Sequence, residues 1–242
     1  MNSVIEEDTR SSRLSVATGR VRQRISAAAL RSKRPVEDIT LVAVSKTQPA
    51  EAVREAIAAG LSEFGENRIQ EAELKIPDVG REAARWHLIG HLQSNKARRA
   101  VELFDMIHSL DSVDLARRLE RVCGAVHRKE LPVLIQVDLG HEATKTGVEE
   151  NDLRNVVDAV RECDRLRLMG LMTLPPFFDD AEKTRPYFKR LRELRDELQT
   201  AEAFGERRGD LSMGMTHDFE IAIEEGATII RVGTAIFGER HV

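Results

Sequence analysis

The chain has 242 residues, of which 41% are hydrophobic and 32% charged, with a net charge of −4. This composition is ordinary for a globular protein, and the small negative charge gives no general attraction to nucleic acid or to an anionic membrane. The N-terminal segment is polar and acidic, and no apolar run approaches the roughly 20 residues needed to cross a bilayer. Cys123 and Cys163 show no CxxC spacing and are interpreted as reduced thiols. We therefore expect a cytoplasmic protein with no membrane or DNA partner.

The pattern of apolar residues predicts the elements in chain order. Residues 1–9 are expected to be disordered, and residues 10–33 to form a helix that ends before Pro35. Eight apolar, β-branched runs follow, at residues 39–45, 63–66, 86–90, 106–110, 133–139, 166–173, 211–215 and 229–233. Helical patterns lie between them, at residues 50–59, 68–76, 95–101, 113–127, 152–162, 186–201 and 219–224.

Regular alternation of strands and helices predicts an α/β protein with a parallel sheet and right-handed crossovers. Eight such units fit a closed (β/α)8 (TIM) barrel, which would make residues 1–242 a single domain. An open doubly wound sheet is the alternative. We favour the barrel because no GxGxxG motif follows the first strand.

Polar residues where strands end are candidate ligand contacts, because barrels bind ligands in the loops that follow their strands. Lys46 comes directly after the first strand, and side-chain alternation from Val42 and Val44 directs it into the barrel. Two interpretations are open for this lysine. It could be a structural residue paired with a carboxylate such as Glu66. It could also be a partly desolvated amine that attacks an aldehyde and holds it as a Schiff base.

The loops after the seventh and eighth strands, SMGMTHD and RVGTA, suggest a phosphate site. Ser212 and Thr216 supply hydroxyls, Gly214 lets the backbone come close, and the N-terminus of the next helix faces the same space. Gly233 and Thr234 contribute from the second loop. Two ordinary tight turns would also explain these residues, but phosphate between these two loops is a recurrent barrel arrangement.

A phosphorylated aldehyde beside a strand-end lysine points to pyridoxal 5′-phosphate (PLP). Arg231 shares the inward face of the eighth strand with Ile229 and Gly233, and its guanidinium could donate to the pyridine nitrogen. Because arginine stays protonated, that nitrogen would stay unprotonated, and the cofactor would be a weaker electron sink than one paired with Asp. A buried ion pair with an acidic neighbour is the alternative role for Arg231.

Longer stretches of the sequence resemble the pyridoxal phosphate homeostasis proteins, also called the YggS/PROSC type. They are LVAVSKTQP, FGENRIQEA, WHLIGHLQSNKAR, LMTLPP and LSMGMTHDFEIAIEEGATIIRVGTAIFGER, with a looser match at VLIQVDLGHEATKTGV, in this order over residues 39–240. The resemblance implies a single barrel like the N-terminal domain of alanine racemase. This is the third fold type of PLP proteins, here without the C-terminal β-domain of the racemase.

The same resemblance implies roles for individual residues. Lys46 would carry PLP as an internal aldimine, Asn67 would lie beside the ring, and Arg231 would approach the pyridine nitrogen. The phosphate would be held by Ser212, Gly233 and Thr234, with Met213, Gly214 and Thr216 nearby. The sequence departs from the family pattern at Thr216, where Ser is usual, at His91, where Pro is frequent, and at Asp138, where Asn is frequent.

Two functions remain open at this stage, apart from an unrelated barrel aldolase with a lysine Schiff base. The protein could bind PLP, buffer its free level and deliver it to apo-forms of PLP enzymes, or it could be a PLP-dependent amino-acid racemase. Racemisation by two bases needs an acid–base group on each face of the substrate. Racemases of this fold type take the second from a C-terminal β-domain that is not expected here, and the only tyrosine, Tyr187, is expected at the surface. We therefore predict a carrier without substantial turnover.

Three further features of the sequence have a structural and a functional interpretation. His87 and His91 form an HxxxH pattern, but they straddle a strand end, so a metal site is not expected. The basic stretch KARRA at residues 96–100 is interpreted as a solvated helix start rather than a phosphate or RNA contact. Lys145 could face the cleft or be a plain loop lysine.

Overall fold

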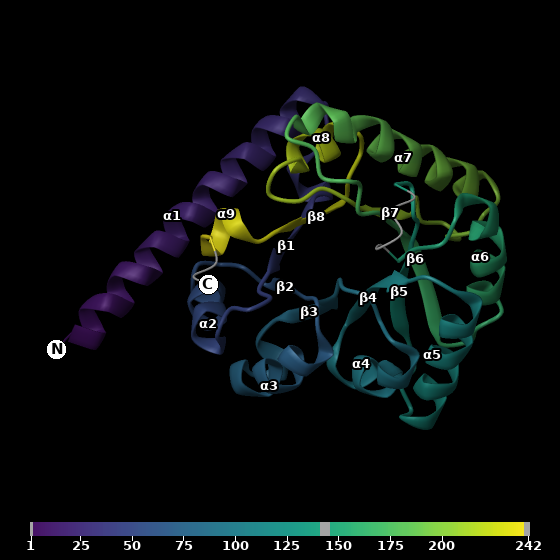
Figure 1. Ribbon diagram of the computed structural model, residues 1–242, viewed down its shortest axis with the longest axis horizontal. Helices are drawn as coiled ribbons and strands as arrows, with labels where there is room; N and C mark the ends of the chain where they lie inside the picture. Colours follow the sequence, from purple (N-terminus) through teal and green to yellow (C-terminus); the bar gives the residue numbers. More distant parts are fainter. Residues whose placement is uncertain (1, 141–145, 240–242) are drawn as a thin grey trace.

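Eight parallel strands form a closed barrel in which each strand neighbours the next one in the sequence (Figure 1). The computed structural model describes residues 2–140 and 146–239, with side chains from residue 13 onward. The strands are β1 Thr40–Val44, β2 Glu63–Glu66, β3 Arg85–Leu88, β4 Met106–Leu110, β5 Leu131–Gln136, β6 Leu166–Met172, β7 Asp210–Ser212 and β8 Ile229–Val232. Pairing of β1 with β8 closes the barrel. The predicted (β/α)8 barrel is confirmed, and the doubly wound alternative was wrong.

Helices surround the barrel, as strand–crossover–strand connections require (Figure 1). They are α1 Asn2–Arg31, α2 Ala50–Ala58, α3 Ile69–Val79, α4 Ala97–Leu103, α5 Val113–Ala125, α6 Leu153–Arg161, α7 Arg185–Thr200, α8 Phe219–Glu224 and α9 Thr234–Phe237. Short 3-10 turns lie at Val36–Asp38, Arg81–Ala83, Ser94–Lys96, Glu150–Asp152 and Ala181–Thr184.

The first helix is longer than the sequence pattern suggested. We expected residues 1–9 to be disordered, but the helical backbone begins at Asn2. No glycine or proline stands between Asn2 and Arg31 except Gly19, so nothing in this segment stops a helix that is anchored further along. The anchor is the apolar face that includes Leu14 and Val21, which is buried where α1 packs against α8 and α9. The N-terminal part of α1 projects beyond the barrel (Figure 1).

The apolar core has two layers because successive strand residues point to opposite faces. Most buried apolar side chains, Ala43 and Trp86 among them, lie in the large cluster between the strands and the surrounding helices. A smaller cluster fills part of the barrel interior, and its buried members are Val42, Met106, Leu134, Met172 and Ile229. Val42 is paired in register with Arg231. The interior of the barrel is therefore only partly apolar, and the remainder is polar.

Within the described ranges, no helix combines the length and the apolar character that a membrane crossing needs. The two cysteines are free thiols, Cys123 buried and Cys163 partly buried, and burial raises the pKa of each to about 11. Neither is a reactive thiolate at neutral pH.

Candidate functional site

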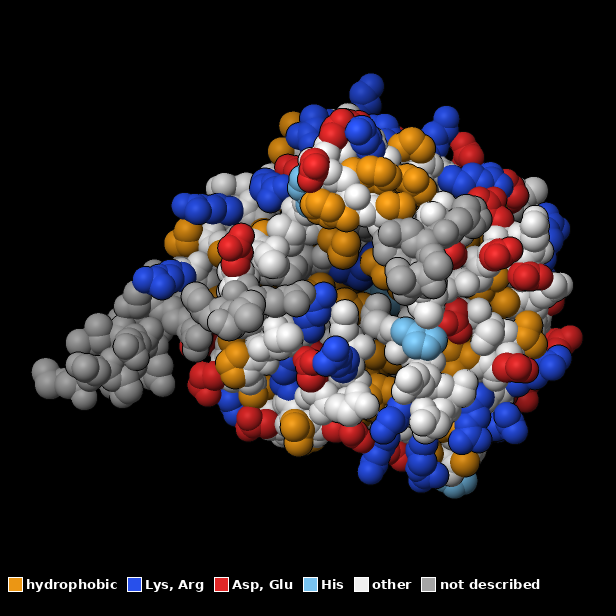
Figure 2. Space-filling model, in the orientation of Figure 1, with side chains coloured by type: hydrophobic (Ala, Val, Ile, Leu, Met, Phe, Trp, Pro, Cys, Tyr) orange, Lys and Arg blue, Asp and Glu red, His pale blue; other side chains and the backbone are white. Residues whose placement is uncertain are grey.

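The residues that the sequence singled out come from four strands that are neighbours in the closed barrel, β7, β8, β1 and β2. Val44 at the end of β1 is in register with Gly65 of β2, and Ala43 is in register with Val232 of β8. The loops after these strands therefore open at the same end of the barrel. Figure 2 shows this face hollowed near its centre, with basic side chains in the hollow.

Lys46 lies two residues beyond the end of β1 and is partly buried. The chain turns directly after it, because Thr47 has a φ of 65° in the left-handed region that a non-glycine residue rarely adopts. The N–H of Thr47 donates to the Glu71 carboxylate at 2.9 Å, which holds this turn against α3. The backbone that presents Lys46 is therefore fixed on both sides of the residue, by the strand and by the turn.

The carboxylate of Glu66, suggested as the structural partner of Lys46, is engaged by another lysine. Lys75 Nζ donates to Glu66 Oε1 at 2.6 Å, and Ser45 Oγ donates to the same oxygen at 2.7 Å. Lys75 also donates to the carbonyl of Ser45 at 2.6 Å. Burial raises the pKa of Glu66, and Lys75 opposes that rise. Sequence analysis missed Lys75, although it belongs to the same buried face of α3 as Ala72 and Ile76.

Arg231 lies inside the barrel, as side-chain alternation predicted, and only 2% of it is exposed. Its NH1 donates to Ser212 Oγ at 2.5 Å and its NH2 to the carbonyl of Thr173 at 2.9 Å. Burial lowers its pKa to about 10, and Asp218 acts in the opposite direction. The alternative of a direct ion pair is not what the structure has, since no carboxylate of the described residues lies within ion-pair distance of Arg231.

The loop after β7 requires glycine at position 214. Gly214 has a φ of 89°, and a Cβ there would lie 2.5 Å from Ala222 Cβ and 2.9 Å from Phe219 Cα. Its carbonyl accepts from the N–H of Arg231 at 3.0 Å, so this loop also fixes the backbone of β8. Met213 is buried and Thr216 is partly exposed.

The carboxylate of Asp218 was not considered from the sequence. It precedes α8 and accepts from the N–H of Met215 at 2.6 Å, so it closes the turn of the β7 loop. Burial raises its pKa, while the Met215 N–H and Arg231 counteract that rise. This carboxylate at the start of α8 makes the α8 end of the loop less suited to an anion than the sequence suggested.

The loop after β8 leads directly into α9. Gly233 is the N-cap residue, and its carbonyl accepts from the N–H groups of Ile236 and Phe237, each at 2.9 Å. Thr234 is exposed at the first position of the helix. The first N–H groups of a helix have no partner within it and face outward toward the loop. A Cβ at Gly233 would lie 3.4 Å from Val44, so β8 and β1 are close together beside Lys46.

Asn67 is partly buried at the end of β2, and the next loop packs tightly against it. A Cβ at Gly90 would lie only 2.2 Å from the carbonyl oxygen of Asn67, so glycine is required where the β3 loop crosses it. His91, Gln93 and Lys96 line a cavity of about 430 Å³ together with Asn67. His91 Nδ1 lies 3.2 Å from Asp111 Oδ2, within contact distance of that carboxylate.

The interior of the barrel holds polar residues that sequence analysis did not assign to the site. His87 and His108 are buried and their rings bond to each other. His87 and His91 therefore have different partners, and among the described residues no group of three or more potential metal ligands occurs. The only sequence signal for His108 was a polar residue in the middle of the fourth apolar run. Lys145 lies outside the described residues.

Comparison with known families agrees with this geometry. A family model described as the N-terminal domain of alanine racemase matches residues 17–241. A pyridoxal phosphate homeostasis protein of Aquifex aeolicus is 43% identical over 91% of this chain and 96% of its own length. The chain belongs to the pyridoxal phosphate homeostasis family.

Solved structures give the same assignment. PipY of Synechococcus elongatus, solved with PLP bound, superposes with a TM-score of 0.76 at 42% identity, over 90% of this chain and all of PipY. Alanine racemase of Corynebacterium glutamicum superposes with a TM-score of 0.68 at 17% identity, over 98% of this chain but 62% of the racemase. The second likeness concerns the fold alone, and it confirms the barrel of the racemase type.

Proposed function

We propose that this protein binds PLP at the loop end of the barrel and acts in intracellular PLP homeostasis by holding the cofactor and giving it up. The observation that carries the proposal is the junction of β8, β1 and β2. There Lys46 is partly buried and Arg231 is buried, and the loops after β7 and β8, which carry glycine and hydroxyl residues, follow neighbouring strands at the same end of the barrel. PipY, which is 42% identical over its whole length, was solved with PLP bound.

The residues present fit the aldehyde, the ring nitrogen and the phosphate of PLP. The Lys46 amine would hold the aldehyde carbon covalently, and the Arg231 guanidinium, which has N–H groups beyond the two bonded to Ser212 and Thr173, would donate to the ring nitrogen. Asn67 would lie beside the ring. When bound, the cofactor would supply an electron-accepting ring, and the protein would hold this ring without catalysing a reaction on it.

The phosphate would lie over the start of α9. Gly233 and Thr234 would contact it there, and Met213, Gly214 and Thr216 would shape the adjoining loop. A phosphate contact of Ser212 stays a prediction, and its hydroxyl already bonds to His108 and Arg231. We assign the side chain of Ser212 mainly to holding Arg231.

A carrier explains the site better than a racemase does. A second acid–base group would have to face the side of the substrate opposite Lys46. Tyr187 is partly buried at the start of α7 and stacks on Phe178, with 5.9 Å between ring centroids, so it is engaged in packing. Arg231 would also keep the ring nitrogen unprotonated, which would disfavour carbanion stabilisation. Apo-forms of PLP enzymes would be transient recipients of the cofactor.

Absorbance of the protein loaded with PLP, before and after borohydride reduction, tests the proposal, with peptide mass mapping to locate the adduct. We expect a visible chromophore that borohydride bleaches and a stable adduct on Lys46. Lys46→Ala should lose both, whereas Lys189→Ala, an exposed lysine of α7, should keep them. An adduct of equal stoichiometry in Lys46→Ala would contradict the assignment.

Turnover is tested by incubating the loaded protein with L-alanine in D2O, followed by chiral analysis. We expect no conversion approaching the usual enzymatic range of about 1–1000 per second. Racemisation within that range would restore the enzyme interpretation.

A further inference from the structure

A continuous chain of hydrogen bonds crosses the interior of the barrel. Glu63 Oε2 lies 2.5 Å from His87 Nε2, and His87 Nδ1 lies 2.8 Å from His108 Nε2. His108 Nδ1 lies 2.9 Å from Ser212 Oγ, which accepts from Arg231 NH1 at 2.5 Å. The five residues come from β2, β3, β4, β7 and β8, so the chain links opposite walls of the barrel.

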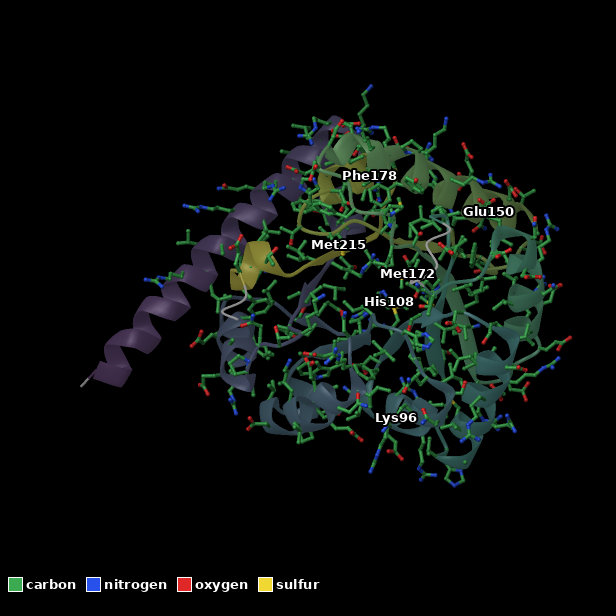
Figure 3. The ribbon with its side chains drawn as sticks, in the orientation of Figure 1. Lys96, His108, Glu150, Met172, Phe178 and Met215 are labelled. Atoms are coloured by element: carbon green, nitrogen blue, oxygen red, sulfur yellow. The ribbon has the colours of Figure 1, made fainter. Side chains whose placement is uncertain are left out.

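This chain of hydrogen bonds connects the two ends of the barrel. Glu63 is the first residue of β2, at the end remote from the ligand loops, and its side chain is 23% exposed. His108 and Ser212 are fully buried, and His87 and Arg231 are each 2% exposed. Figure 3 places His108 near the barrel axis, beside Met172. A carboxylate in contact with solvent at one end is thus connected to the guanidinium at the other.

The donors and acceptors of the hydrogen-bond chain fit one direction of donation, from Arg231 toward Glu63. A carboxylate only accepts, so His87 donates from Nε2 to Glu63 and, when neutral, accepts at Nδ1 from His108 Nε2. Burial, reinforced by His87 and Arg231, lowers the pKa of His108 well below its ordinary value, so His108 is neutral. It therefore accepts at Nδ1 from the Ser212 hydroxyl, whose oxygen accepts from Arg231.

The opposite direction leaves a hydrogen unsatisfied. If His87 were an imidazolium, it would donate to His108 Nε2, and His108 would donate from Nδ1 to Ser212. The buried Ser212 oxygen would then accept twice, and its hydrogen would have no acceptor among the hydrogen bonds of the described residues. Buried hydrogen-bonding groups are rarely left unpaired. The arrangement that runs from Arg231 to Glu63 is the satisfied one.

We propose that Glu63, His87 and His108 are positioning residues of the cofactor site, which act on bound PLP through Ser212 and Arg231. They orient the guanidinium group of Arg231. Glu63 supplies the negative charge at one end of the hydrogen-bond chain, and Arg231 supplies the positive charge at the other end, where it would meet the ring nitrogen. This inference rests on the proposed function only where it concerns PLP. The hydrogen-bond chain consists of protein groups alone and can be tested without the cofactor.

The first experiment is nitrogen NMR of the cofactor-free protein labelled with ¹⁵N-histidine, with His87→Gln and His108→Leu used to assign the signals. We expect both rings to be neutral near pH 7 and to carry their hydrogen on Nε2. A hydrogen on Nδ1 of His108, or a charged His87, would overturn the direction of the chain. Failure of the protein to bind PLP would not affect the NMR result for the two histidines and would contradict only the proposed function.

The second experiment measures PLP dissociation constants in a double-mutant cycle. His108→Leu should weaken binding about tenfold in the wild type but less than about twofold when Arg231 is already Ala, because the effect passes through Arg231. The variant should also shift the absorbance maximum of the Lys46 adduct in the wild type. Equal losses in both backgrounds would show that His108 only supports the fold, and would overturn the proposal.

The third experiment compares two carboxylates at the end of the barrel remote from the ligand loops. Glu63→Gln keeps an acceptor for His87 but removes the charge, and should weaken PLP binding about threefold while the adduct on Lys46 remains. Asp210→Asn is the matched control, because Asp210 begins β7 and its carboxylate accepts from Thr228, which is not part of the hydrogen-bond chain. It should leave PLP affinity unchanged. An unchanged PLP affinity in Glu63→Gln, or equal changes of affinity in both variants, would contradict the proposed role of the hydrogen-bond chain.

Discussion

Two buried cations lie near the loop end of the barrel, and they are satisfied in different ways. Lys75, between β2 and α3, meets the buried carboxylate of Glu66 at 2.6 Å and is fixed in an ion pair. Arg231, inside the barrel, meets a hydroxyl and a carbonyl, and its hydrogen bonds lead to a carboxylate, Glu63, through Ser212 and two histidines. Both cations are more than nine-tenths buried, so exposure does not distinguish them.

The difference separates a structural charge from one that can act on a ligand. A lysine paired with an adjacent carboxylate exerts little electrostatic attraction on a third group. A guanidinium held by neutral acceptors keeps its positive charge and has N–H groups left to donate. The second arrangement costs desolvation, which is reflected in the lowered pKa of Arg231. We expect substitutions at Lys75 to change stability and substitutions at Arg231 to change cofactor affinity.

The largest effect is expected on breaking the ion pair. Lys75→Met would leave Glu66 as an uncompensated buried charge, and should lower the free energy of unfolding by about 3–5 kcal/mol in urea titration. Combining it with Glu66→Leu should recover most of the loss, because both charges are then removed. A double variant as unstable as the single one would show that packing, and not charge, carries the effect.

Arg231→Ala tests the other cation. Loss of a buried hydrogen bond to a charged group is worth roughly 1.5–3 kcal/mol, which corresponds to about a tenfold to hundredfold weaker PLP affinity. Titration of the cofactor-free protein with PLP measures this directly. Unchanged affinity would place the ring nitrogen elsewhere, and Lys75→Met provides the comparison in which the folded protein should bind PLP normally.

Gly214→Ala would disturb the loop that holds the backbone of Arg231. A Cβ there overlaps Ala222 and Phe219, so a loss of about 1–3 kcal/mol of stability is expected beyond the cost of the left-handed backbone. Gly205→Ala is the matched control, since Gly205 also has a positive φ, 62°, but has no atom within 4 Å of the added Cβ. Equal losses in the two variants would mean that the overlap is relieved without cost.

The smallest effect concerns acid. Because the pKa of His108 is lowered in the folded protein, only the unfolded chain takes up its proton as pH falls below the ordinary value of 6.5. The free energy of unfolding should then fall by about 1.4 kcal/mol per pH unit from this residue, between 6.5 and its folded pKa. Urea titrations at about pH 7.5 and 5.5 should show this slope reduced in His108→Leu. The exposed His127, changed to Asn, should leave the slope as it is in the wild type.

Much of this architecture followed from the sequence alone. The alternation of eight apolar runs with helical patterns predicted the closed barrel, and strand periodicity correctly directed Arg231 inward. The N-terminal helix was underestimated, because its first residues have no apolar periodicity of their own and are continued from a helix anchored by α8 and α9. The roles of Lys46, Asn67 and the loop residues toward PLP stay predictions.

Partner choice was the part that only the tertiary structure decided. The sequence placed a lysine and a carboxylate, Lys46 and Glu66, at adjacent strand ends, but it did not indicate that Lys75 of α3 donates to that carboxylate. His108 and Ser212 are 104 residues apart and touch because the barrel closes with its particular register. Periodicity states which face a side chain occupies. It does not state which side chain of another wall lies opposite, since that depends on how all eight strands are staggered around the axis.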